Sequence, residues 1–128
     1  MTNAEFRDLL EKRTKDFSVA VFKCLDALPK KTSTRVISYQ LGKSASSVGA
    51  NYREANRAES KMDFGHKLQI ALKEASESAY WLEILVDLYP MHDAFRKLYV
   101  ESVELRNIFQ RIAQTARTVK GKSVCADR

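Results

Sequence analysis

The sequence predicts an all-α protein, folded as an antiparallel up-down-up-down four-helix bundle. Apolar residues recur at steps of three and four in four segments, which is the period of a helix with one buried face. The chain of 128 residues has 4 Gly and 2 Pro, too few for a turn-rich all-β fold. Short connections between long helices favour antiparallel neighbours. We therefore expect one domain over residues 1–128 with a core large enough to need no disulfide or metal.

The first helix is expected over residues 3–28. Thr2 and Glu5 have the spacing of a capping box, in which two residues three apart satisfy free amide groups reciprocally. Pro29 cannot continue the helix, because it has no N–H to donate. The residues expected to face the core are Phe6, Leu10, Phe17, Val21, Cys24 and Leu28.

The second helix is expected over residues 34–56, with Ser33 or Thr34 as its N-cap. Its inward series is unusually polar for a core-facing stripe. The series consists of Ile37, Leu41, Ser44, Val48, Asn51 and Ala55. Since a buried amide or hydroxyl without a partner costs about 1–3 kcal/mol, Ser44 and Asn51 need partners across the bundle. Glu74, Glu77 and Ser78 of the third helix are candidates.

Small side chains also line the second helix, at Gly42, Ala45, Ser46, Gly49 and Ala50. A helical Gly costs about 0.5–1 kcal/mol relative to Ala, so two of them indicate a packing reason. One interpretation is close packing against another helix of the same bundle. The other is contact with a second subunit, for which Gly42, Ser46 and Gly49 are the candidates, together with the aromatic pair Tyr80 and Trp81.

The third helix is expected over residues 61–89, with Ser60 and Asp63 as a capping box and Pro90 after its end. Its inward residues alternate steps of four and three without a break, which is a heptad pattern. They are Phe64, Leu68, Ala71, Ala75, Ser78, Leu82, Leu85 and Tyr89.

The fourth helix is expected over residues 91–119, followed by a basic tail over residues 120–128. The inward residues of this helix are Leu98, Ser102, Leu105, Phe109, Ile112, Ala116 and Val119. No segment approaches the length of a membrane span, and the N-terminus has no apolar core typical of a signal peptide. Cys24 reads as a buried thiol and Cys125 as a tail residue, so we expect a cytoplasmic protein that contacts no membrane.

Catalytic and metal-binding patterns are lacking. A di-iron bundle needs two Glu-x-x-His motifs, whereas the two histidines, His66 and His92, offer one weak Asp-x-x-His half-motif. The sequence contains no glycine-rich phosphate loop, and nothing in the spacing places a nucleophile beside a base. We therefore expect no enzyme activity, no metal and no cofactor.

Positive charge is the feature nearest to a function. The net charge is +6, and residues 30–61 hold seven Lys and Arg against two Glu. The candidate nucleic-acid-binding residues are Arg35, Lys43, Arg53, Arg57 and Lys61. A second basic group on the fourth helix contains Arg106, Arg111, Arg117, Lys120 and Lys122. Only Tyr39 and Tyr52 are interleaved with the first group, which disfavours a single-strand stacking platform.

Residues 47–85 resemble the signature of the 23S rRNA-intervening sequence proteins, also called the S23 family. The matching positions are Ser47, Ala50, Asn51, Glu54, Arg57, Ser60, Phe64, Ile70, Ala71 and Glu77. One position departs from the pattern, because Ala55 stands where many members have Gly. The remaining helices match the family in length, order and apolar pattern.

The resemblance implies a closed four-helix bundle that assembles as a ring, a homopentamer, with no established enzymatic activity. A similar bundle, the accessory protein of diversity-generating retroelements, forms a basic ring that binds nucleic acid and a reverse transcriptase. Ser47, Asn51, Glu54 and Glu77 are expected to form a structural polar network. The expected function is thus a non-enzymatic scaffold that binds RNA, DNA or a ribonucleoprotein. The alternative is a structural or protein-interaction scaffold whose charge is incidental.

Overall fold

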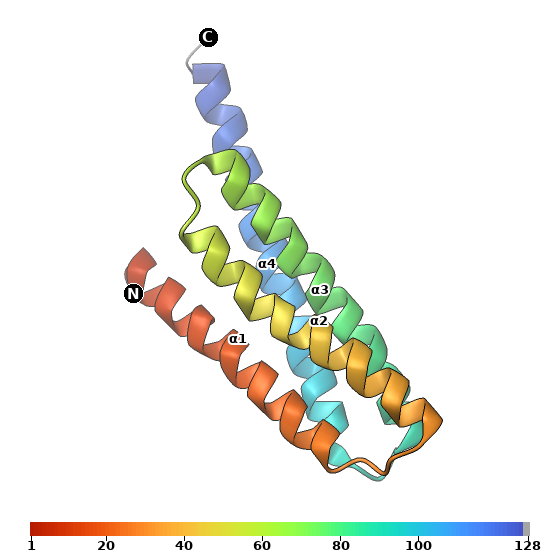
Figure 1. Ribbon diagram of the computed structural model, residues 1–128. Helices are drawn as coiled ribbons and strands as arrows, with labels where there is room; N and C mark the ends of the chain where they lie inside the picture. Colours follow the sequence, from red (N-terminus) through yellow and green to blue (C-terminus); the bar gives the residue numbers. More distant parts are fainter. Residues whose placement is uncertain (127–128) are drawn as a thin grey trace.

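The computed structural model describes residues 1–126, and side chains up to residue 116. It contains helices α1 (Asn3–Asp26), α2 (Thr32–Asn56), α3 (Lys61–Leu88) and α4 (Asp93–Ala126). Successive helices run in opposite directions, which confirms the predicted all-α four-helix bundle (Figure 1). The expected ranges agree with the observed helices to within two residues at every end except the C-terminal end of α4.

The start of α1 has the predicted capping box. The Glu5 amide donates to Thr2 Oγ1 at 3.0 Å, and the Thr2 amide donates to Glu5 Oε1 at 3.4 Å. At the start of α3, the Asp63 amide donates to Ser60 Oγ at 3.0 Å, so Ser60 is the N-cap as expected. These side chains satisfy amide groups that have no partner within the helix.

The predicted cap of α2 is wrong, because its N-cap is Lys31 rather than Ser33 or Thr34. Thr34 instead lies in the first turn and closes the α1–α2 connection. Its hydroxyl accepts from the Lys31 amide at 2.9 Å and also donates to the Pro29 carbonyl. Thr34 is buried, so the same side chain caps the helix from inside and anchors the loop.

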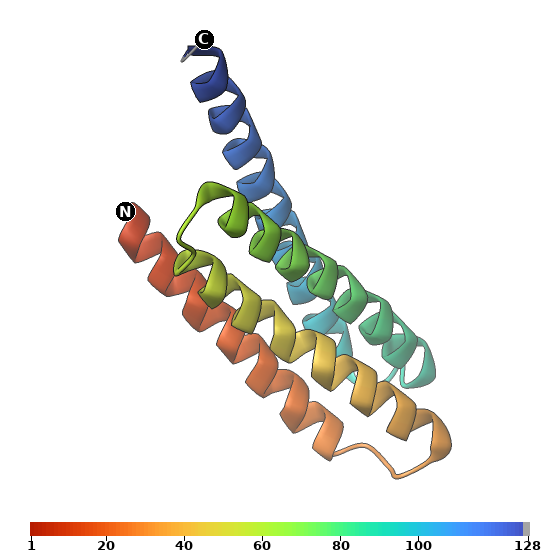
Figure 2. The same cartoon turned by 45° about the horizontal axis from the view of Figure 1, so that its top comes forward.

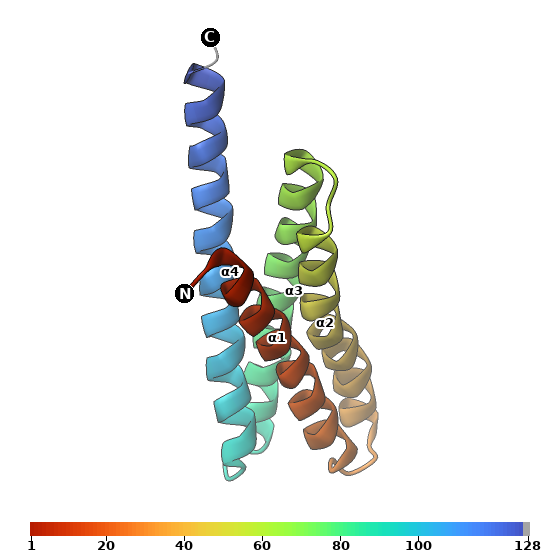
Figure 3. The same cartoon turned by 90° about the vertical axis from the view of Figure 1, so that its left-hand side faces the viewer.

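The C-terminal helix is longer than predicted. α4 continues to Ala126 rather than ending at residue 119, so most of the expected tail is helical, and only residues 127–128 lie outside the described residues. A single helical Gly such as Gly121 costs about 1 kcal/mol, which does not stop a helix by itself. α4 therefore extends beyond the ends of the other three helices (Figure 3).

The core is built from the predicted inward residues of all four helices. Val21, Leu41, Leu82 and Leu105 are each fully or almost fully buried. Two inward predictions are wrong: the Phe6 side chain is 41% exposed, and Asn51 is only half-buried. Tyr52 on α2 and Phe109 on α4 meet across the bundle, with ring centroids 5.4 Å apart.

α1 packs along α2 over most of its length and more sparsely against α4 (Figures 1 and 2). One polar cluster bridges α1 and α4. Arg13 Nε and Nη2 donate to the two carboxylate oxygens of Glu101 at 2.7 and 2.6 Å, and Nη2 also donates to Glu104 at 2.6 Å. The hydrogen bond to Glu101 raises the pKa of Arg13, so the guanidinium stays charged at any ordinary pH.

Candidate nucleic-acid interface

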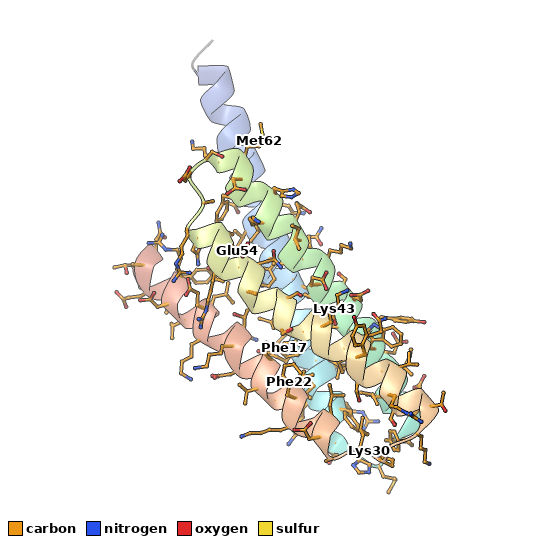
Figure 4. The ribbon with its side chains drawn as sticks, in the orientation of Figure 1. Phe17, Phe22, Lys30, Lys43, Glu54 and Met62 are labelled. Atoms are coloured by element: carbon orange, nitrogen blue, oxygen red, sulfur yellow. The ribbon has the colours of Figure 1, made fainter. Side chains whose placement is uncertain are left out.

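Four of the predicted basic residues lie on one face of α2. At about 100° per residue, Arg35, Lys43, Arg53 and Arg57 fall within about 80° of the helix circumference, and the row is about 33 Å long. We call this row the α2 basic face. All four side chains are exposed, and Figure 4 shows Lys43 near the middle of the helix. The sequence analysis grouped these residues by charge, and the helix now places them along one line.

The members of the α2 basic face differ in how firmly they are held. Arg53 Nε lies 3.7 Å from Glu11 Oε1 on α1, a partly exposed ion pair that fixes its position. Arg35 and Arg57 donate only to backbone carbonyls one turn earlier, at 3.4 and 3.2 Å. Lys43 has no ion pair within four ångströms among the described residues. Three of the four cations are therefore free to contact phosphates.

Lys61 lies off this row, at the first position of α3. Together with Arg7 it lines a hollow of about 360 Å³ at the α2–α3 connection, beside Asn56, Glu59 and Ser60. On α4, Arg106 is half-buried and Arg111 is exposed. The other three members of the second basic group, Arg117, Lys120 and Lys122, lie outside the residues whose side chains are described.

Aromatic side chains contribute little to this surface. Tyr39 is 66% exposed on the same side of α2, whereas Tyr52 is buried against Phe109. One exposed ring cannot stack successive bases along a strand. The α2 basic face is therefore suited to phosphate contacts, which do not read base sequence.

The predicted polar network of Ser47, Asn51, Glu54 and Glu77 is only partly present. Asn51 Nδ2 donates to the Ser47 carbonyl one turn earlier, at 2.8 Å. Glu54 turns instead to Lys67 of α3, with 3.0 Å between charged atoms, and this hydrogen bond raises the pKa of Lys67. No described hydrogen bond joins Glu77 to Asn51 or Glu54, since Glu77 is exposed on α3.

The buried polar residue of α2 does find a partner on α3, as expected. The Ser78 hydroxyl donates to the Ser44 hydroxyl at 2.9 Å, and both side chains are fully buried. Near the surface of the same helix pair, Glu74 has a raised pKa because of partial burial and because Glu77 lies close by. The α2–α3 contact thus has a hydroxyl pair in its interior and a carboxyl pair at its edge.

The small side chains of α2 lie against α1 of the same chain. A Cβ at Gly49 would be 3.0 Å from Thr14 Oγ1, and a Cβ at Gly42 would be 3.1 Å from Cε1 of Phe22. Between them, the Ser18 hydroxyl donates to the Ala45 carbonyl at 3.1 Å. The structure therefore realises the first of the two interpretations, close packing within the bundle. Contact of Gly42 and Gly49 with a second subunit would require α1 to move away.

The other candidate interface residues lie nearer the surface. Ser46 is half-buried and donates to the Gly42 carbonyl at 2.8 Å. Tyr80 is 58% exposed and stands edge-on to Trp81, with ring centroids 5.3 Å apart. The indole Nε1 of Trp81 is buried without a hydrogen-bond partner. Tyr80 is therefore the candidate that is available to another molecule.

Within the described residues, no three His, Cys, Asp or Glu side chains come together as a metal site. The Cys24 thiol is half-buried, and this burial raises its pKa, which disfavours the reactive thiolate. No helix of the described part of the chain has the length and apolar character needed to cross a membrane.

Comparison with known proteins identifies relatives of the whole bundle. The family model of the 23S rRNA-intervening sequence proteins matches residues 9–111. A solved structure of a protein of unknown function from the S23 ribosomal protein family of Bacteroides thetaiotaomicron shares 34% identity with the chain, with a TM-score of 0.73. The match covers 80% of this chain and 96% of that protein. No curated protein matches the chain.

Proposed function

We propose that this chain, which belongs to the family of 23S rRNA-intervening sequence proteins, is a non-enzymatic scaffold that binds RNA, DNA or a ribonucleoprotein. The observation that carries the proposal is the α2 basic face. It presents cations along about 33 Å of one helix, and only Arg53 among them has an acidic partner within ion-pair distance. Such a row contacts phosphates and leaves the bases unread.

Assembly is the second part of the proposal. Four cations spread over one helix bind phosphate weakly, because affinity follows the number of phosphates neutralised. A homopentameric ring, which the family resemblance suggests, would present the same row several times to one nucleic acid. Multiple contacts on one strand raise the overall affinity without any new contact. The exposed Tyr80 is a candidate anchor for the subunit contact.

The test is the solution mass of the full chain by light scattering, alone and with a mixed-sequence RNA or a DNA duplex at about 50 and 200 mM salt. The proposal predicts an oligomer whose mass rises with nucleic acid at the lower salt concentration. The triple variant Arg35→Glu, Lys43→Glu, Arg57→Glu should weaken binding by about tenfold or more. Arg53 is left unchanged, because its reversal would also disturb the contact with Glu11.

A matched control reverses three exposed lysines on other helices. Lys15→Glu, Lys23→Glu and Lys97→Glu change the net charge by the same amount without touching α2. If both triple variants lose binding equally, the affinity comes from net charge and the α2 basic face is not the site. An oligomer that ignores nucleic acid at both salt concentrations would instead favour the protein-interaction scaffold, for which the exposed Tyr80 beside Trp81 is the supporting observation.

A further inference from the structure

An apolar groove of about 590 Å³ lies between the start of α3 and the far half of α4. Its walls are formed by Met62, Phe64 and Leu68 from α3 and by Ile112, Ala113 and Ala116 from α4. The groove is at the end of the bundle from which α4 extends, where Figure 4 places Met62. Its volume and apolar lining are those of a small-molecule site.

Gly65 has no packing reason within the chain. It lines the groove, and a Cβ built on it would meet no atom within 4 Å. Gly42 and Gly49 differ, because each faces a side chain of α1 at about van der Waals distance or closer. A helical Gly that nothing inside the protein requires costs about 1 kcal/mol relative to Ala. Gly65 therefore keeps open a space that the bundle itself does not fill.

The groove also carries positive charge. Lys61 and Arg111 line it, and neither forms an ion pair among the described residues. The groove lies beside the N-terminus of α3, where the helix dipole adds a partial positive charge. No acidic side chain lines the groove. An occupant with an apolar body and one negative end would match both the lining and the charge.

The length of the groove argues for a single chain rather than a docked helix. The residues of its α4 wall, 111–116, rise by about 8 Å along the helix axis. A docked helix uses anchors at positions i and i+7, which are about 10.5 Å apart. An unbranched alkyl chain can bend into the shorter space and pack against the exposed backbone at Gly65.

We propose that the α3–α4 groove binds a single-chain amphiphile with a carboxylate head group. The alkyl chain contacts Phe64, Leu68 and Ile112, and the carboxylate pairs with Lys61 and Arg111. The inference is independent of the proposed nucleic-acid binding, because Arg35, Lys43 and Arg57 lie outside this groove.

The test is a calorimetric titration of the full chain with dodecanoate below its micelle-forming concentration. The proposal predicts saturable binding with about one site per chain, and binding about tenfold weaker for dodecyltrimethylammonium, which has the same alkyl chain and the opposite charge. Gly65→Leu fills the groove and should weaken dodecanoate binding by about tenfold or more. Lys61→Gln and Arg111→Gln should each weaken it severalfold.

The matched controls are Ser76→Leu and Lys73→Gln, exposed positions of α3 outside the groove. They should leave the affinity unchanged, and urea unfolding verifies that each variant is folded. Absence of saturable binding, equal binding of the two amphiphiles, or full binding by a folded Gly65→Leu variant would each overturn the proposal. The triple α2 variant should still bind dodecanoate, so the two proposals can fail separately.

Discussion

Gly49 of α2 packs directly against Thr14 of α1. A Cβ at position 49 would lie 3.0 Å from Thr14 Oγ1 and 3.2 Å from its Cβ. Thr14 is fully buried, and its hydroxyl already donates toward the carbonyls of Leu10 and Glu11. The side chain cannot turn away, so a larger residue at position 49 has to separate the two helices.

Gly49→Ala should therefore destabilise the protein. Overpacking of a tight contact costs about 1–3 kcal/mol, and this exceeds the gain of about 1 kcal/mol or less from better helix propensity. Urea unfolding followed by circular dichroism gives the change in the free energy of unfolding. A stabilised Gly49→Ala variant would show that α1 and α2 are not in close contact at this position.

Two other glycines provide a graded comparison. Gly65→Ala should stabilise the protein by about 0.4–1 kcal/mol, because the added methyl group meets no neighbour and the unfolded chain loses freedom. Gly42→Ala should be close to neutral, since it contacts the far end of the Phe22 ring, which is 45% exposed and can rotate. The expected order of stability changes is Gly65, then Gly42, then Gly49, and a different order contradicts the packing described here.

The buried pair of Ser44 and Ser78 should be energetically coupled. Each single change to Ala removes one partner of a buried hydrogen bond, at a cost of about 1 kcal/mol. The double variant should lose less than the sum of the two single losses, with a coupling energy of about 0.5–1.5 kcal/mol. Ser44→Ala combined with the exposed change Ser76→Ala provides the additive control. Strict additivity of Ser44 and Ser78 would mean that the two hydroxyls do not bond.

Glu74 should make stability depend on pH. Its pKa is raised in the folded protein by partial burial and by Glu77, so the folded state binds the proton more tightly than the unfolded state. Stability should therefore fall as the pH rises from the unfolded pKa, about 4.3, through the folded pKa. Glu74→Gln should stabilise the protein at neutral pH and lose this advantage in acid. The exposed Glu83→Gln variant serves as the control, and an equal pH profile for wild type and Glu74→Gln would refute the assignment.

The contact of Arg13 with Glu101 and Glu104 should hold α1 against α4. Arg13→Gln should lower stability by about 0.5–1 kcal/mol, a modest loss because the side chains are partly exposed and screened. Arg13→Lys should lose most of the same energy, because Lys cannot form the bidentate contact. Repeating the urea titrations at about 1 M salt should shrink the difference from wild type. A salt-independent loss would point to packing of the Arg13 stem instead.

The sequence by itself determined the number, order and inward faces of the helices. Heptad spacing in α3 and the stops at Pro29 and Pro90 are local signals, since helix periodicity and proline geometry act within a few residues. The capping box of Thr2 and Glu5 is local for the same reason. The cap of α2 was misplaced because Thr34 bonds backward to the loop, a contact that depends on how the connection folds.

Only the tertiary structure decided which neighbour each side chain meets. The small residues of α2 were compatible with a second subunit or with another helix, and the approach of Thr14 and Phe22 resolves the position of Gly49 and Gly42 within the chain. Charge counts identified Arg35 and Arg57, but their common line appears only once α2 is one straight helix. Gly65 carried no sequence signal of its own, because a glycine that faces open space and one that faces a packed helix look alike until the surrounding helices are in place.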